Sequence, residues 1–134
     1  MKKLTLICFF VFVSIWSVKA QDNDREKLFK QIEAAKIAYI TKELSLSPTD
    51  AERFFPLYNQ YQREKRELIH QRRSKTGKRR GELEFDSQVL ALKMRYRDAF
   101  IPIINAKRTA RFFEAEREFR EKLMKELRER REKK

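Results

Sequence analysis

Residues 46–55 read LSPTDAERFF and residues 104–113 read INAKRTARFF, so one phrase occurs twice, 58 positions apart. Each copy holds an apolar residue, then a side chain able to cap a helix, and further on an Arg-Phe-Phe triplet. A capping side chain satisfies backbone N–H groups that have no partner in the first turn of a helix. Each copy therefore predicts a helix start, and the two together predict two helix-turn-helix units of similar build.

The first copy gives the clearer start signal. Leu46 is the apolar residue that precedes the predicted cap, Ser47. Pro48 then takes the first helical position, where a missing N–H costs nothing, and Asp50 is placed to complete a capping box. In the second copy, Asn105 is the predicted cap.

Helix breakers are rare, since the chain has two glycines and three prolines and is rich in Glu, Lys, Arg, Leu and Ala. Apolar residues recur at steps of three and four, as on one face of a helix. We predict an all-α fold of four helices at about residues 24–43, 48–72, 85–101 and 106–130. Pro102 is expected to end the third helix. Residues 72–81 (RRSKTGKRRG) hold both glycines and no apolar side chain, which predicts a basic loop.

The first 20 residues have the pattern of a secretory signal peptide. Lys2 and Lys3 form a basic head, residues 4–16 are nearly all apolar, and Val18 and Ala20 suit the cleavage site. The apolar run is shorter than the roughly 20 residues that span a bilayer. We predict cleavage after Ala20, with residues 21–134 forming a single helical domain in the periplasm.

Removal of residues 1–20 takes away three lysines and no acid, so the formal charge falls from +13 to +10. The only cysteine also lies there, so no disulfide can form within the domain. A strongly basic chain attracts acidic partners over a long range, less so in salt. Nucleic acid is a weaker candidate partner, because an exported chain does not meet it.

Enzymatic and metal-binding roles are disfavoured. His70 is the only histidine, so no Ser-His-Asp set and no Cys-His set can be formed in the exported chain. There is no Gly-rich phosphate-binding loop. His70 and Glu67 lie one helical step apart, but a metal site needs more ligands than two. We therefore predict no catalytic residues, no cofactor and no metal site.

The phrase that starts at Leu46, continued by Pro56, Leu57 and Tyr58, resembles the LTxxQ signature of the Spy/CpxP family of periplasmic helical proteins. That family is similar in turn to CnrX-type metal sensors. Asp50 stands where the family has Gln, and the second copy keeps only the apolar and capping positions. The resemblance implies a four-helix kinked hairpin that pairs in an antiparallel homodimer and forms a cradle. In chaperone members, a concave surface of basic and apolar side chains holds unfolded clients without ATP.

Three roles stay open. The first is an ATP-independent chaperone or envelope-stress protein for unfolded or acidic clients. The second is a sensor that acts with a membrane anti-sigma partner of an extracytoplasmic sigma factor. The third is a basic protein that bridges anionic envelope surfaces, with weak contact to an anionic membrane. The candidate client-binding residues are the aromatic Phe54, Phe55, Tyr58, Tyr61, Phe112 and Phe113, and the cationic Arg72, Arg73, Lys78, Arg79 and Arg80. The simpler interpretation is that the aromatic residues anchor the core and the basic loop is solvated.

Overall fold

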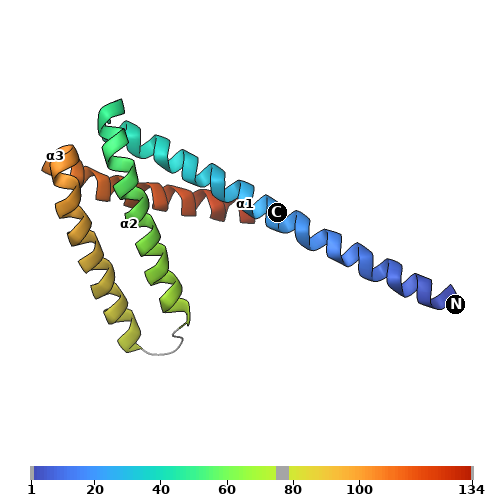
Figure 1. Cartoon of the computed structure of the whole chain (residues 1–134). Coiled ribbons are helices and arrows are strands. Elements are labelled where there is room, and N and C mark those ends of the chain that lie inside the picture. The colour runs from blue at the N-terminus through green and yellow to red at the C-terminus, as the bar shows by residue number, and fades with distance from the viewer. Residues whose placement is uncertain (1, 75–78, 134) are drawn as a thin grey trace. The chain divides into compact units, whose positions relative to one another are not determined.

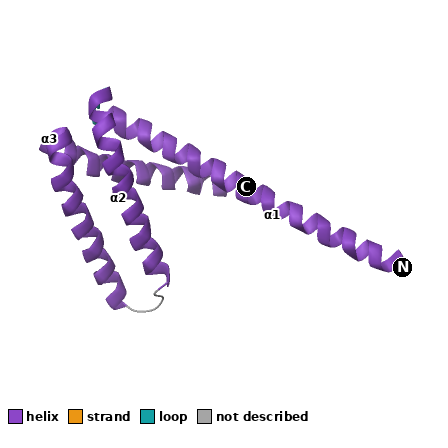
Figure 2. Ribbon diagram, viewed as in Figure 1, coloured by secondary structure: helices purple, strands orange, loops and turns teal. Residues whose placement is uncertain are grey.

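The chain is helical over almost all of the residues that the structure describes. The computed structural model describes the backbone of residues 2–74 and 79–133, and the side chains of residues 22–73 and 81–133. It contains α1 (Lys2–Glu43), α2 (Pro48–Ser74) and α3 (Arg79–Glu132), shown in Figures 1 and 2. The described residues outside these helices lie in short turns, so the all-α prediction is confirmed.

Two compact units divide the chain, residues 1–38 and residues 39–134. The described part of the first unit belongs entirely to α1. The predicted helix start near residue 24 is wrong, because no glycine or proline interrupts the chain between Lys2 and Glu43 and the helix runs through. Within the described residues, no helix has both the length and the apolar character to cross a membrane.

The end of α1 is closed by backbone hydrogen bonds. Ser45 adopts a left-handed conformation, with φ of 47°. The N–H of Ser45 donates to the Lys42 carbonyl and that of Leu46 to the Thr41 carbonyl, each at 3.1 Å. This pair of bonds satisfies the last carbonyls of the helix and turns the chain toward α2.

The start of α2 follows the predicted motif. The Ser47 Oγ accepts a hydrogen bond from the Asp50 N–H at 3.1 Å, and the Asp50 carboxylate accepts one from the Ser47 N–H at 3.5 Å. Pro48 is the first residue of the helix. The predicted cap, first position and capping box are therefore confirmed.

α3 is interrupted at Asn105, where φ is 69° and ψ is 168°. On one side of this residue, the Arg108 Nε donates to the carbonyl of Ile104 at 2.8 Å, so the last carbonyl of the preceding helical stretch has a hydrogen-bond partner. On the other side, the Asn105 Oδ1 accepts the Arg108 N–H at 3.0 Å. The predicted cap is thus confirmed, and the junction needs only one non-helical residue.

The predicted helix end at Pro102 is wrong, because Pro102 lies inside α3 and the helix continues to Ile104. A proline at this depth removes one backbone hydrogen bond. Ile104 is fully buried and Ile103 packs against the core, so the extra turn gains apolar burial that offsets the lost bond.

The described residues at both ends of the predicted basic loop, 72–74 and 79–81, are helical. Arg72 and Arg73 belong to the last turn of α2, where cations are favoured by the helix dipole, and Arg79 and Arg80 belong to α3. Arginine is a good helix former, so these positions extend the helices. Lys78 lies outside the described residues.

The core of the second unit is an aromatic cluster between α2 and α3. The two equivalent phenylalanines of the repeat, Phe54 and Phe112, are fully buried and meet edge to face with ring centroids 5.5 Å apart. The Phe100 ring lies 4.9 Å from Phe54 and 5.1 Å from Phe112. Aliphatic side chains complete the packing, among them Ile40 of α1, Leu44 directly after it and Ile104 of α3.

A second pair of equivalent positions also meets. Asp50 and Arg108 are related by the 58-residue offset, and the Arg108 Nη1 donates to the Asp50 Oδ2 at 2.8 Å. This hydrogen bond is the main reason why the pKa of Asp50 lies below its usual value. The two copies of the repeat therefore meet at two pairs of equivalent positions, one aromatic and one of opposite charge.

Replacing Ser47 with alanine should lower the free energy of unfolding by about 1 kcal/mol, because the Asp50 N–H loses its acceptor. Chemical denaturation monitored by circular dichroism measures this. Ser87→Ala is the matched control, since Ser87 is exposed within α3 and alanine is the better helix former there. Equal losses in the two variants would show that the cap contributes nothing.

Candidate functional site

The structure places most of the predicted client-binding aromatic residues in the core. Four of them are 0% exposed: Phe54, Tyr58, Tyr61 and Phe112. A side chain without exposed surface cannot touch a client, so these four are core anchors, as in the simpler interpretation. Phe55 and Phe113 are half-buried and pack against the same cluster.

The predicted basic residues are partly described. Arg72 and Arg73 are exposed at the end of α2. The Arg72 guanidinium lies 4.7 Å from the centre of the Phe85 ring and 3.6 Å from the Glu82 carboxylate. The side chains of Lys78, Arg79 and Arg80 are outside the described residues.

A buried carboxylate, Glu116, lies beside the aromatic cluster. It accepts hydrogen bonds from the Tyr61 Oη at 3.0 Å, the Gln62 Nε2 at 3.0 Å and the Lys65 Nζ at 2.7 Å. Burial, and then the charge of Glu116, raise the pKa of Tyr61, so the phenol stays protonated as a donor. A carboxylate is tolerated inside a protein when it is paired and hydrogen-bonded in this way.

Glu116 was not among the predicted site residues, although the sequence carries a signal for it. Glu116 follows Phe112 by four residues and precedes Phe119 by three, which puts a charge on the apolar face of the helix. A charge at such a position needs a partner from another helix.

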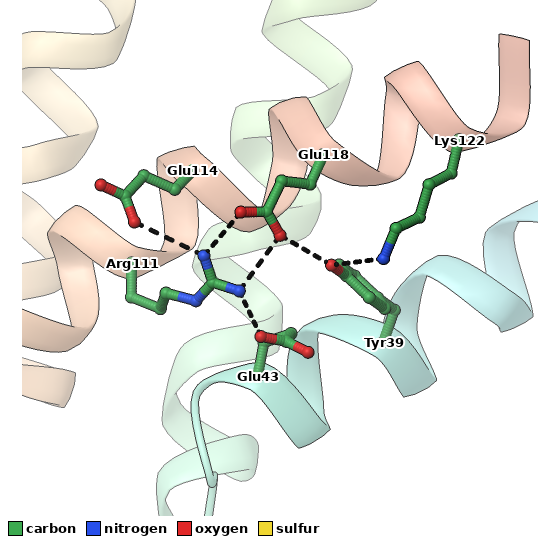
Figure 3. A network of polar contacts seen from close by, with 6 residues as sticks. All are labelled: Tyr39, Glu43, Arg111, Glu114, Glu118 and Lys122. Carbon is green, nitrogen blue, oxygen red and sulfur yellow. Dashed lines mark hydrogen bonds and ion pairs between the residues drawn. The ribbon is translucent and has the colours of Figure 1, made fainter. Parts of the chain in front are cut away.

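A second polar network surrounds Arg111, the arginine of the second Arg-Phe-Phe triplet (Figure 3). Its guanidinium binds both oxygens of Glu118, at 2.9 and 3.1 Å, and also pairs with Glu43 and Glu114. The Tyr39 hydroxyl donates to Glu118 at 2.9 Å. These contacts, that of Arg111 first, lower the pKa of Glu118 to about 2. The network ties the last turn of α1 to α3, which is a structural role.

An exposed apolar stripe runs along the first part of α3. Its members are Leu83, Leu90, Met94 and Ile101, whose exposed fractions are 76%, 59%, 48% and 38%. Their spacing of seven, four and seven residues puts all four within about 40° of one another around the helix. Buried Leu92 lies on the opposite side of α3. A narrow stripe of large exposed apolar side chains is typical of a surface that contacts another chain.

A basic pocket of about 620 Å³ lies between α2 and α3. Its charged lining consists of Lys65, Arg72, Arg73, Lys93 and Arg120. Its apolar lining consists of Ile69, Phe85 and Val89. A second hollow, of about 460 Å³, also lies between these helices and has mixed charges, including Glu64, Glu67 and Arg95.

Metal-ligating side chains are scattered over the part of the chain whose side chains are described. Among the residues whose side chains are described, no group of three or more His, Cys, Asp or Glu is arranged to hold a metal ion. His70 and Glu67 are both exposed on α2. The binding surfaces that the geometry offers are therefore the apolar stripe and the basic pocket.

Comparison with known proteins identifies no relative of this chain. No protein-family model, no curated protein and no solved structure matches the chain. The resemblance to the Spy/CpxP family therefore rests on the motif that begins at Leu46.

The Arg111 network makes stability depend on pH in the acid range. Because the pKa of Glu118 falls from 4.5 to about 2 on folding, its contribution is present above pH 4.5 and is lost as the pH falls toward 2. We expect the thermal midpoint of the wild-type protein to fall more steeply over this range than that of Glu118→Gln. Glu114→Gln, at the longer 3.4 Å contact, is the control and should keep the wild-type slope. Identical slopes for wild type and Glu118→Gln would contradict the assignment.

Glu116→Ala should be much more damaging than removal of an exposed acid. It takes the acceptor from three donors in a buried setting and leaves Lys65 without its carboxylate. We expect a loss of about 3 kcal/mol in the free energy of unfolding. Glu121→Ala, at an exposed position of the same helix, should change it by less than about 0.5 kcal/mol. Urea denaturation measures both, and similar small losses would remove Glu116 from the core network.

Proposed function

We propose that this protein is a non-enzymatic, ATP-independent chaperone or envelope-stress protein that holds unfolded polypeptides against the apolar stripe of α3. The observation that carries the proposal is the stripe itself, with four large apolar side chains aligned on one exposed face. Covering such a face removes apolar surface from water, which favours binding by about 25 cal/mol per Å². The contact is non-directional and so suits clients of many sequences.

The charge of the chain supports the same role. A formal charge of +13, or +10 without the predicted signal peptide, attracts acidic clients before contact. The exposed Arg72 and Arg73 are part of this basic surface. The predicted signal peptide supports a proposed activity in the periplasm, where a chaperone has to work without a nucleotide.

We also propose the finer architecture that the motif implies. We assign the four helices of the proposed kinked hairpin to α1, α2 and the two parts of α3 on either side of Asn105. Two such chains associate as an antiparallel homodimer. The seven-four-seven spacing of the stripe supports this association, because helices pack along apolar seams of that period.

The same spacing favours a second candidate function. A regular seam fits a folded helix better than it fits an unfolded client, so the stripe also suits a helix of a membrane anti-sigma partner. In that case the protein is a regulatory sensor of the envelope. Bridging of anionic envelope surfaces, the third role, depends on the net charge and not on the stripe.

Aggregation of an unfolding client, followed by light scattering without nucleotide, tests the proposal. The protein should suppress aggregation, and Leu90→Ser with Met94→Ser should weaken suppression by about tenfold or more, since each side chain buries apolar surface worth over 1 kcal/mol. Met124→Ser is the control, because Met124 is exposed on α3 outside the stripe.

Sedimentation of the same variants distinguishes the candidates. If the wild-type protein suppresses no aggregation and the double variant changes only from dimer to monomer, the stripe is a contact between copies and the chaperone proposal fails. Loss of suppression with the dimer intact places the clients on the stripe.

A further inference from the structure

The basic pocket between α2 and α3 has a lining that specifies its ligand. Of its eight lining residues, five are lysine or arginine and three are hydrocarbon or aromatic side chains. Lysine and arginine side chains carry hydrogen-bond donors and no acceptor. The lining side chains therefore offer donors and apolar surface, and nothing that can accept a hydrogen bond.

A peptide segment fits this lining poorly. Each peptide unit brings an N–H donor, and a donor that is buried without an acceptor is costly. A ligand whose polar part only accepts hydrogen bonds, and whose remainder is hydrocarbon, matches the lining better. Such a molecule is an anionic amphiphile.

Three of the five lining cations, Lys65, Lys93 and Arg120, lie at one end of the pocket, near the buried carboxylate of Glu116. Glu116 pairs with Lys65 at 2.7 Å. Burial is the main cause that lowers the pKa of Lys93. The positive charges of Lys65 and Arg120 lower this pKa further, and the negative charge of Glu116 raises it. Three cations and one carboxylate leave an excess of two positive charges, close to the charge of a phosphate monoester near neutral pH.

The apolar part of the pocket continues from this end along the two helices. Ile69 follows Lys65 by one turn of α2, and Val89 and Phe85 precede Lys93 by one and two turns of α3. A chain that starts at the cationic end can therefore lie over about two helical turns of hydrocarbon. The Arg72 guanidinium stacks 4.7 Å from the Phe85 ring at the far end of this surface.

We propose that this pocket binds a single-chain alkyl phosphate, with the phosphate at Lys65, Lys93 and Arg120 and the alkyl chain over Ile69, Val89 and Phe85. The volume of about 620 Å³ is in the range of small-molecule pockets, roughly 300–1,000 Å³. The site is separate from the apolar stripe, because Val89 and Lys93 face α2 whereas Leu90 and Met94 face solvent. It therefore goes beyond the proposed chaperone function and does not depend on it.

Isothermal titration of the purified protein with dodecyl phosphate below its micelle concentration tests the proposal. We expect saturable binding at one site per chain. Inorganic phosphate should bind at least about a hundredfold more weakly, because it gains nothing from the apolar lining. Dodecyl maltoside, with the same chain and no charge, should not compete. Equal binding of the neutral amphiphile would overturn the role of the cations.

Two pairs of variants locate the site. Lys93→Gln should weaken dodecyl phosphate binding about tenfold, as expected for one charged hydrogen bond, whereas Lys107→Gln, an exposed lysine outside the pocket, should not. Val89→Trp should fill the apolar part and weaken binding, whereas Ser87→Trp, at an exposed position of α3 outside both the pocket and the stripe, should leave binding unchanged. Circular dichroism confirms that each variant is folded. Unchanged affinity in both Lys93→Gln and Val89→Trp would overturn the proposal.

Two competitors separate the other sources of the same chemistry. Vesicles of phosphatidylcholine with phosphatidic acid present the phosphate within a bilayer, and an acidic peptide presents carboxylates on a polypeptide. If the protein binds the vesicles and does not bind free dodecyl phosphate, the pocket binds a membrane surface and the proposal fails. If the acidic peptide binds more tightly than dodecyl phosphate and displaces it, the site belongs to acidic polypeptides and the proposal also fails.

Discussion

The contact between Phe54 and Phe112 is the interaction on which the second unit depends. Each ring is the central residue of an Arg-Phe-Phe triplet, and the capped helix starts at Ser47 and Asn105 set the register that brings the rings together. One turn closer to the caps, Asp50 and Arg108 meet in the same way. Because like positions of a repeat lie against each other, the repeat builds the core. Its aromatic residues are used there, and the surfaces left for binding are formed by other residues.

Burial of charge in so thin a core shapes the surface beside it. Glu116 enters the core region because Tyr61, Gln62 and Lys65 supply donors. It neutralises one cation, and the neighbouring Lys93 and Arg120 remain as excess positive charge at the edge of an apolar groove. In a chain with 33 basic and 20 acidic residues, such an excess is expected somewhere, and the helix packing decides where it is concentrated.

Local features of the fold were predictable from the sequence, and features that join distant segments were not. The caps at Ser47 and Asn105 depend on residues within one turn, so their side-chain chemistry was sufficient. The helix end predicted at Pro102 was wrong, because the burial of Ile104 favours a helix that continues past the proline. The pattern Arg-Phe-Phe does not show which of the two rings faces the core. The pocket could not be predicted either, because Lys65, Lys93 and Arg120 come from three separate stretches of the chain. The stripe on α3 was readable from its spacing, but apolar residues at helical spacing usually form the core.

The break at Asn105 links stability to binding. Lys93 and Val89 precede it and Arg120 follows it, so the cations of the basic pocket come from both helical parts of α3. The direction in which the second part leaves the junction is set by one left-handed residue, its cap to the Arg108 N–H and the bond from the Arg108 side chain to the Ile104 carbonyl. The same junction places Phe112 against Phe54 and brings Arg120 into the pocket that Lys65 lines. The lining of the pocket thus depends on the same junction as the core packing, and a change there alters both together.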